Sequence, residues 1–236
     1  MTRRNEKAMP AHYRVLKRKI VLVMAAAAII PLIILAAINY FEFQAAFLRE
    51  AQAPFRSMVA KTKNSFELFL AERSSTVSLI ASIYSYDDLA DQRTLNRIFR
   101  AMQREFSGFA DLGLIDMQGR LVNYVGPYQK ELEGVDYSEQ EWFHKVRVQN
   151  RFTSEVFSGF RRFPHVVIAV QHTTEDGQSW IVRATLDTTQ FTKLIAAMNL
   201  EPWSDAFLLN RQGVLQTDSA QYGKIFDKIP FAMPAS

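Results

Sequence analysis

The residues best placed for chemistry lie on a predicted strand, Ser179–Asp187, in which polar and apolar residues alternate. Successive side chains of a strand point to opposite faces, so Arg183 and Asp187 share one face while the other face is apolar. A guanidinium fork could bind a carboxylate, and a carboxylate could accept from an amine or a hydroxyl. A ligand cavity on this polar face is therefore one interpretation. The alternatives are a solvated face of an antiparallel sheet, and Asp187 as the cap of a following helix, Thr188–Met198.

Other residues could complete such a cavity. Arg161 and His165 flank a predicted tight turn and could attract an anion, although basic turns are more often solvated, and His165 could titrate near neutral pH. Aromatic residues could wall the cavity with rigid area, with ordinary core packing as the alternative for at least half of them: Tyr124, Tyr128, Trp142, Phe157 and Phe160. For a small metabolite with a carboxylate or an amine, the predicted ligand-binding residues are Tyr124, Trp142, Phe157, Arg161, His165, Arg183 and Asp187.

Catalytic and metal-binding patterns are missing from the sequence. It contains no nucleophile elbow, phosphate-binding glycine loop, HExxH motif or kinase signature. His165 and His172 are seven residues apart on one predicted strand, so they point to opposite faces, and no cysteine is present to supply a thiolate ligand. The sequence therefore predicts a chain that is not an enzyme and that holds neither a metal nor a cofactor.

A predicted α+β fold positions the candidate residues. Apolar residues at spacings of three, four and seven predict one long amphipathic helix from Gln44 to about Tyr84, and the acidic residues that follow it predict the start of a second helix. After Gly108 the pattern changes to strands separated by turns, with a helix at Ser138–Gln149. Together they predict a PAS-like antiparallel five-stranded sheet, with strands Asp111–Asp116, Arg120–Val125, Phe152–Arg161, Pro164–Thr173 and Ser179–Asp187.

A membrane anchor precedes the long helix. Ile20–Ile38 is uncharged and almost purely aliphatic, and its nineteen residues at about 1.5 Å each nearly match a hydrocarbon core of about 30 Å. A signal peptide usually has a shorter apolar core and a small-residue cleavage site, and a buried core helix would carry some polar residues. We predict a transmembrane helix at residues 20–41 of a cell (inner) membrane. By the positive-inside rule, residues 1–19 form a cytoplasmic tail and the bulk of the chain is extracytoplasmic.

The charge distribution argues against a nucleic-acid partner. Residues 1–19 hold seven basic residues and one acidic residue, so the net charge of this segment exceeds the net charge of +4 of the whole chain. The remainder of the chain is therefore slightly acidic, and it has no run rich in lysine and arginine. The basic character belongs to the membrane anchor, and binding to phosphate backbones is not expected.

An internal repeat indicates a second module. Leu114–Leu121 reappears 94 residues later as Leu208–Leu215, each copy with two apolar residues, an Asp or Asn, a glycine and a returning strand. This is the pattern of a tight hairpin. The first module needs roughly 80 residues from its hairpin to its closing helix, and fewer residues than this follow the second hairpin in the sequence. Residues 200–236 are therefore predicted to be the truncated start of a second module, after a first module within residues 42–199.

The order of anchor, long helix, PAS-like sheet and second hairpin resembles the double Cache extracellular sensor domain of bacterial membrane receptors. Asp111–Val125 is similar to the family's first hairpin, and Tyr137–Phe143, with its Trp and following aromatic residue, is similar to the helix that lines the family's pocket. Glu155–Arg161 and Pro164–Val170 are most similar to versions fused to sensor histidine kinases. The family's amino-acid-binding subgroup places an arginine three residues before the tryptophan, where this sequence has Glu139.

The resemblance implies a function in signalling. It implies that the chain is the sensing portion of a transmembrane receptor, in which the membrane-distal module binds a small ligand and the membrane-proximal module passes the signal on. The implied output is a two-component histidine kinase outside this sequence, in a homodimer with the long helices side by side. The alternatives are the sensor of a chemoreceptor or a diguanylate cyclase, and a membrane-tethered periplasmic protein-interaction domain.

Overall fold

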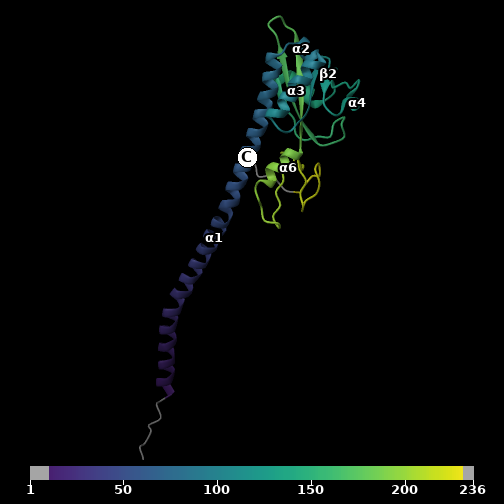
Figure 1. Cartoon of the computed structure of the whole chain (residues 1–236). Coiled ribbons are helices and arrows are strands. Elements are labelled where there is room, and N and C mark those ends of the chain that lie inside the picture. The colour runs from purple at the N-terminus through teal and green to yellow at the C-terminus, as the bar shows by residue number, and fades with distance from the viewer. Residues whose placement is uncertain (1–10, 231–236) are drawn as a thin grey trace, which may run out of the picture. The chain divides into compact units, whose positions relative to one another are not determined.

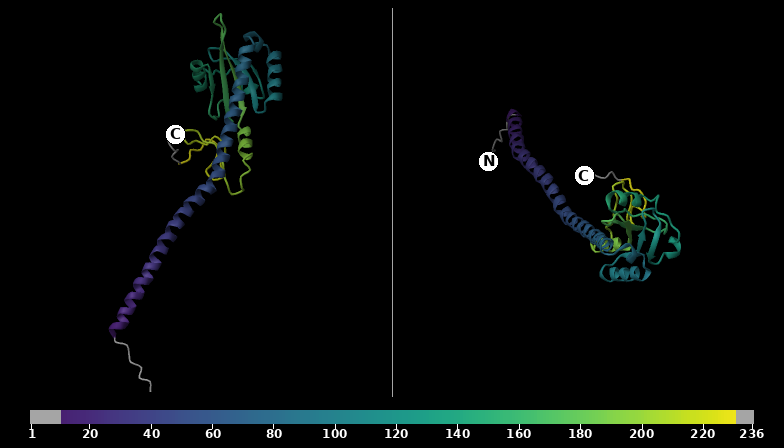
Figure 2. Two further views of the ribbon diagram at one scale, coloured as in Figure 1. Left: turned by 90° about the vertical axis from the view of Figure 1, so that its left-hand side faces the viewer. Right: turned by 90° about the horizontal axis from the view of Figure 1, so that it is seen from above.

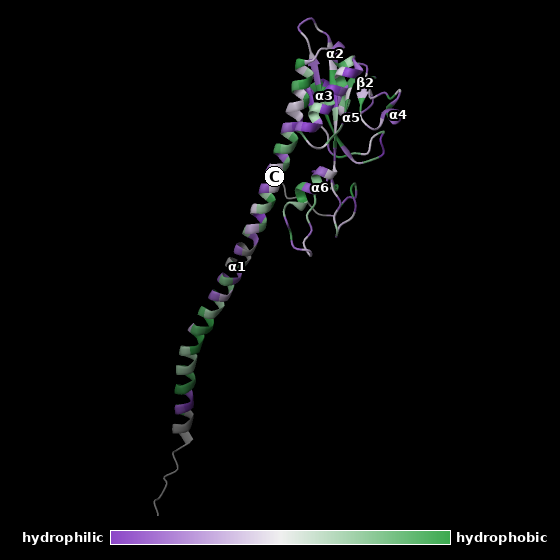
Figure 3. Cartoon of the chain, in the orientation of Figure 1, coloured by the Kyte–Doolittle hydropathy of each residue, from purple (hydrophilic) through white to green (hydrophobic). Residues whose placement is uncertain are grey.

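The computed structural model describes residues 11–230, and it divides into two compact units with the boundary after Val59. Helix α1, Ala11–Ile83, contributes to both units (Figure 1). Within the described residues, the one helix segment long and apolar enough to cross a membrane is Leu16–Gln44. It contains the predicted span Ile20–Ile38, and Figure 3 shows its hydrophobic residues after a short hydrophilic start. Of the predicted basic tail, residues 1–10 lie outside the described residues.

The second unit is built on a five-stranded antiparallel sheet with strand order β2-β1-β5-β4-β3. The two longest strands pair with each other at the centre, so residues on both faces of β5 are buried. The predicted α+β class and five-stranded sheet are confirmed. The strands are β1 Phe109–Ile115, β2 Leu121–Val125, β3 Arg151–Thr153, β4 His165–Thr173 and β5 Ser179–Asp187.

Helices cover both faces of the sheet. On one face, α2 (Tyr86–Ala90), α3 (Gln92–Glu105) and the end of α1 bury apolar residues against alternate residues of β5, such as Trp180 and Val182. The other face packs against α5 (Glu141–Gln149), whose Trp142 and Phe143 contribute to a second apolar cluster with Ile181. Figure 2 (left) shows the sheet between α3 and α5. The short helices α4 (Gln129–Leu132) and α6 (Thr189–Ala196) lie in the connections.

Local signals explain where the helices after α1 begin. The Ser85 hydroxyl accepts from the Asp88 amide while the Asp88 carboxylate accepts from the Ser85 amide, which forms a capping box for α2. Asp91 ends α2 and caps α3 by accepting from the amide of Thr94, at 2.8 Å. The sequence predicted a single helix start from these acidic residues, whereas the structure shows two short-range starts, one for α2 and one for α3.

One predicted strand is much shorter than expected. The sequence predicts a strand over Phe152–Arg161, whereas β3 ends at Thr153. Beyond it, Phe157 forms an isolated bridge with His165, and Gly159 and Arg162 adopt positive φ values of 52° and 56°. These residues leave the sheet edge as the β3–β4 connection, residues 154–164, because their side chains reach buried partners on the sheet face. The predicted helices Ser138–Gln149 and Thr188–Met198 are likewise shortened, to α5 and α6.

The two copies of the repeated sequence form the same turn. In each copy the side-chain oxygen of the Asp or Asn accepts from the amides two and four residues later, and the glycine amide donates to the carbonyl of that Asp or Asn. Gly119 and Gly213 both have positive φ, as this turn requires. The acceptors are Asp116, at 3.0 and 2.9 Å, and Asn210, at 3.0 and 2.8 Å.

Candidate functional site

The candidate site is centred on Arg183, in the middle of β5. Its neighbours across the sheet are Gly113 on β1 and Ala169 on β4, the smallest side chains available. They leave room on both sides for a long side chain to lie along the face of the sheet. Arg183 is 1% exposed, although it carries a charge. A buried guanidinium is costly unless it is paired, so the groups around it define what the site can do.

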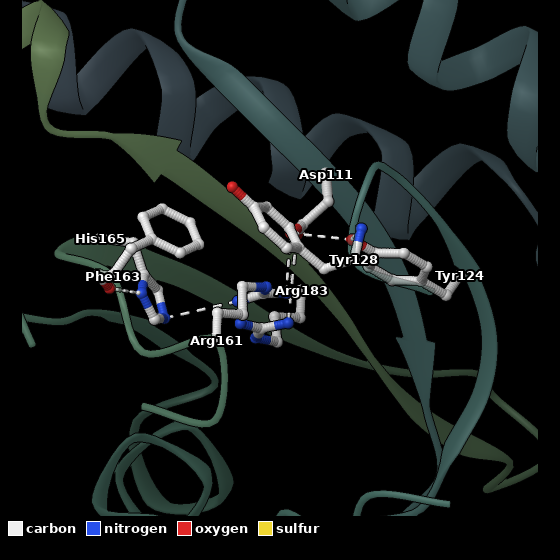
Figure 4. A network of polar contacts seen from close by, with 7 residues as sticks. All are labelled: Asp111, Tyr124, Tyr128, Arg161, Phe163, His165 and Arg183. Atoms are coloured by element: carbon white, nitrogen blue, oxygen red, sulfur yellow. Dashed lines mark hydrogen bonds and ion pairs between the residues drawn. The ribbon is translucent and has the colours of Figure 1, made fainter. Parts of the chain in front are cut away.

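Asp111 is the acidic partner of two buried arginines. It lies two residues before Gly113 on β1, so it shares the face of Arg183. Its Oδ2 atom is 2.7 Å from Nη2 of Arg161, and its Oδ1 atom is 4.0 Å from Nη1 of Arg183. Figure 4 shows the carboxylate and the two guanidinium groups facing one another. All three side chains are at most 2% exposed, so water screens their charges poorly.

Tyr124 bonds the same oxygen of the Asp111 carboxylate that pairs with Arg161. Its hydroxyl donates to Oδ2 of Asp111 at 3.3 Å and accepts from the amide of Tyr128 at 3.2 Å. Burial raises the pKa of the Tyr124 hydroxyl, and the nearby Asp111 charge raises it further, so the group remains a neutral donor. The carboxylate is therefore held from β2 as well as from the β3–β4 connection.

His165 extends this network as a neutral base. Nδ1 lies 2.8 Å from the carbonyl oxygen of Phe163, which can only accept, so Nδ1 carries the proton. Nε2 lies 3.4 Å from Nη1 of Arg161, which can only donate, so Nε2 accepts. Burial is the main cause that lowers the pKa of His165 to about 4, and the nearby arginines add to it. At neutral pH the ring therefore orients Arg161 without adding a charge.

Arg183 has fewer partners than Arg161. Within residues 11–230, its Nε and Nη1 atoms have no hydrogen-bond acceptor. The guanidinium instead lies 5.1 Å from the ring centre of Tyr137 and 5.5 Å from that of Trp142. Burial lowers the pKa of Arg183, and the positive charge of Arg161 lowers it further. Arg183 is thus a desolvated cation that could form additional hydrogen bonds.

A small cavity adjoins this guanidinium. Its volume is about 10 Å³, which is room for about one water molecule. The walls come from three parts of the chain: the residues around α4 and α5, the β3–β4 connection, and the sheet. The lining residues are Leu132, Tyr137, Gln140, Trp142, Phe157, Gly159, Phe160, Arg161, His165 and Arg183.

Most of the residues predicted from the sequence meet at this cavity. Trp142, Phe157, Arg161, His165 and Arg183 line it, and Tyr124 lies behind it through its bond to Asp111. Asp187 does not line it, because its carboxylate accepts from the amide of Thr189 at 2.8 Å, at the start of α6. The polar face of β5 is also not solvated, because Arg183 and Thr185 are buried.

Asp111 is the residue that sequence reasoning missed. It was assigned only as the first residue of a strand. The signal was a single carboxylate within the apolar segment Phe109–Ile115, in a sheet whose two faces are both covered. Such a residue must be buried, and a buried charge needs a partner.

The charges at the site favour an anion over a metal ion. The cluster combines two guanidinium cations and one carboxylate with a neutral imidazole. Across residues 11–230, no group of three or more His, Cys, Asp or Glu side chains could hold a metal ion. The arrangement can therefore form charge-assisted hydrogen bonds to an oxyanion, with aromatic rings to cover the rest of a ligand.

The fold is similar to extracellular sensor domains of known structure. An extracellular ligand binding receptor from Desulfohalobium retbaense has a TM-score of 0.60 at 16% identity, over 75% of this chain and only 33% of the receptor. The sensor domain of the V. cholerae histidine kinase DctB has a TM-score of 0.59 at 14% identity, over 80% of this chain and 73% of that domain. The ligand binding domain of the Pseudomonas aeruginosa amino acid chemoreceptor PctB, in complex with L-Gln, has a TM-score of 0.52 at 15% identity, over 70% of this chain and 67% of that domain.

Neither the protein-family models nor the curated proteins include a match to this chain. At the identities above, the likeness to solved structures is one of fold. The chain is thus similar in fold to extracellular sensor and ligand-binding domains, including those of a histidine kinase and a chemoreceptor.

Proposed function

From this shared fold, we propose that the chain is the sensing portion of a transmembrane receptor that binds a small extracytoplasmic ligand at the Arg183 cavity. The ligand carries a carboxylate or an amine, and the cavity residues that bind it are Trp142, Phe157, Arg161, His165 and Arg183. Asp111 and Tyr124 support them from behind. In this proposal the chain is not itself an enzyme and needs no cofactor.

One observation carries this proposal. Arg183 is fully buried, two of its nitrogen atoms have no acceptor within the described residues, and it borders a cavity walled by Tyr137 and Trp142. The fold alone does not require a cation there, because an apolar residue of similar volume would continue the cluster around Ile181. A ligand that accepts hydrogen bonds from Arg183 would repay its desolvation.

A thermal-shift screen of small metabolites tests the proposal. The full chain is purified in detergent, and its unfolding midpoint is followed with each compound, because a ligand that binds the native state alone raises the midpoint. We expect at least one carboxylate or amine to raise it, and Arg183→Gln to abolish that response. Arg120→Gln, which removes an exposed arginine paired with Asp116, is the matched control and should respond as the wild type does.

A second candidate function is a membrane-tethered protein-interaction module. It is favoured by the small volume of the cavity and by a larger groove of about 610 Å³ nearby. That groove lies along α5, the edge strand β3 and the β3–β4 connection, and is lined by polar and aromatic residues such as Lys145 and Phe152. If no compound raises the unfolding midpoint and Arg183→Gln folds normally, the ligand-sensing proposal fails and this candidate becomes the better one.

The remaining parts of the proposal concern the assembly. We propose that α1 crosses the inner membrane with residues 1–19 in the cytoplasm, and that residues 200–236 begin a second, membrane-proximal Cache module. The output would be a histidine kinase, with a chemoreceptor or diguanylate cyclase as alternatives, in a homodimer. Phe55 and Val59 support a homodimer, because both are more than half exposed on α1 and could pack against a second copy.

A further inference from the structure

We infer that the site selects ligands with a single net negative charge, because Asp111 is a resident counter-ion that neutralises only one of its two arginines. This inference rests on the proposed function and names the charge class of the ligand. It separates this site from that of the chemoreceptor crystallised with L-Gln, whose ligand has no net charge from its amine and carboxylate together.

The charge count follows from the residues in contact. Arg161 and Arg183 are cations, Asp111 is an anion, and His165 is neutral because its Nδ1 proton is bonded to a carbonyl and its Nε2 accepts from Arg161. No acidic residue is among those that line the cavity in the described part of the chain. The buried cluster therefore has a net charge of +1, because the two arginines share one carboxylate.

Asp111 is positioned to retain its pairing when a ligand binds. Its Oδ2 atom is held by both the hydroxyl of Tyr124 and the guanidinium of Arg161, and Asp111 is not among the residues that line the cavity. Arg161 and Arg183 both line the cavity, but Arg183 is the less tightly paired of the two, at 4.0 Å from Asp111 against 2.7 Å for Arg161. A ligand carboxylate would therefore bond Arg183 while Asp111 continues to neutralise Arg161.

The other charge classes would each leave a buried imbalance. A zwitterionic amino acid would leave the positive charge uncompensated and add an ammonium group, and no carboxylate lines the cavity in the described residues to accept from it. A dianion would replace one excess positive charge by one excess negative charge, and a cation would add to the repulsion. Because uncompensated charges are costly in a desolvated site, a monoanion should bind most tightly.

Room for the ligand must come from the β3–β4 connection, residues 154–164. The cavity of about 10 Å³ is smaller than any carboxylic acid, and this connection supplies Phe157, Gly159, Phe160 and Arg161 to its lining. Outside β3 and β4 it has little regular structure, and Phe160 is 45% exposed. An outward movement of its exposed part around Phe160 would open the cavity while Arg161 stays paired with Asp111 and Phe157 stays bridged to His165.

The test compares ligands that share a carbon skeleton and differ in charge. Titration calorimetry on the full chain in detergent would use propionate, alanine, malonate and propylamine, and the same four charge classes on two longer skeletons. We expect the monoanion to bind at least tenfold more tightly than its matched zwitterion, dianion and cation. Tighter or equal binding of a zwitterion or dianion would overturn the charge inference and leave the sensor proposal standing. Binding by none of the compounds would overturn both.

Two variants test the role of Asp111 itself. Asp111→Asn adds one net positive charge, so the ratio of dianion to monoanion affinity should rise at least tenfold. The double variant Asp111→Asn with Arg161→Gln restores a single positive charge, so it should regain the preference for the monoanion. The double variant also removes the unpaired cation that could unfold Asp111→Asn. The inference would be refuted if Asp111→Asn kept the wild-type ratio of dianion to monoanion affinity. It would also be refuted if the double variant preferred the dianion.

Discussion

Mild acidification should destabilise the sensor fold through His165. The ring is buried against Phe157 and Phe163, lies 3.4 Å from the guanidinium of Arg161, and has Arg183 close by. Asp111 is the acidic group in this environment, and it is already paired with Arg161. A proton added to Nε2 would therefore be placed next to a cation, in a site with little water to screen it.

The size of the effect follows from proton linkage. The pKa of His165 is lowered to about 4 in the folded chain, against about 6.5 for an unperturbed histidine in the unfolded chain. Between these values the unfolded state binds more protons, so the stability rises with pH and is lost as the pH falls from about 6.5 towards 4. Between pH 7 and pH 5 the expected loss in the free energy of unfolding is about 2 kcal/mol.

Urea unfolding at the two pH values measures this loss. Trp142 and Trp180 are buried and report on the fold by their fluorescence, whereas Trp203 is exposed. In His165→Gln the pH dependence should shrink by about 2 kcal/mol, because glutamine does not titrate. His144→Gln removes an exposed histidine on α5 and is the matched control. If His165→Gln kept the wild-type difference between pH 7 and pH 5, the assignment of a buried neutral imidazole would be wrong.

Two further predictions concern neighbours of the site. Gly126→Ala should destabilise the chain by about 1–3 kcal/mol, because the added Cβ would lie 2.5 Å from both the Tyr124 hydroxyl and Cβ of Asp111. Gly177→Ala also places a side chain at a positive φ, of 87°, but its Cβ meets no atom within 4 Å, so it should cost less in urea unfolding. Gln216→Leu should lower the free energy of unfolding by about 1–3 kcal/mol, because Oε1 of Gln216 accepts from the buried amide of Val156 at 2.8 Å. Gln212→Leu changes an exposed position and should leave the urea midpoint unchanged.

Local patterns were sufficient to predict much of the fold. Alternation along Ser179–Asp187 placed Arg183 on the opposite face from Trp180, and both side chains lie as predicted. The Asp or Asn with a following glycine predicted the two similar turns at Asp116 and Asn210. These features depend on hydrogen bonds and side-chain directions within a few residues, so the sequence carries them directly.

Long-range pairing was what the sequence could not provide. The segment after Thr153 has the composition of a strand, but Arg161 pairs with Asp111, fifty residues earlier in the chain, and this contact draws the segment away from the sheet edge. Asp187 had two possible roles in the sequence, and the amide of Thr189 is the partner it has in the fold. In both cases the choice depends on tertiary neighbours, which no local periodicity encodes.

Under the proposed function, the charged cluster reduces the stability of the fold in order to bind a ligand. An apolar substitute for the buried ion pairs would often be neutral or stabilising, and the same sheet face already carries an apolar cluster that such residues would extend. Gly113 and Ala169, beside Arg183, bury little apolar area themselves, and their small size leaves room for the Arg183 side chain. The β3–β4 connection that carries Arg161 also bonds residues of the second turn segment, through Val156 to Gln216 and through Glu155 to Asn210. Because one segment contacts both the cavity and residues 208–216, an opening of the cavity that moves it must also strain or break those two bonds.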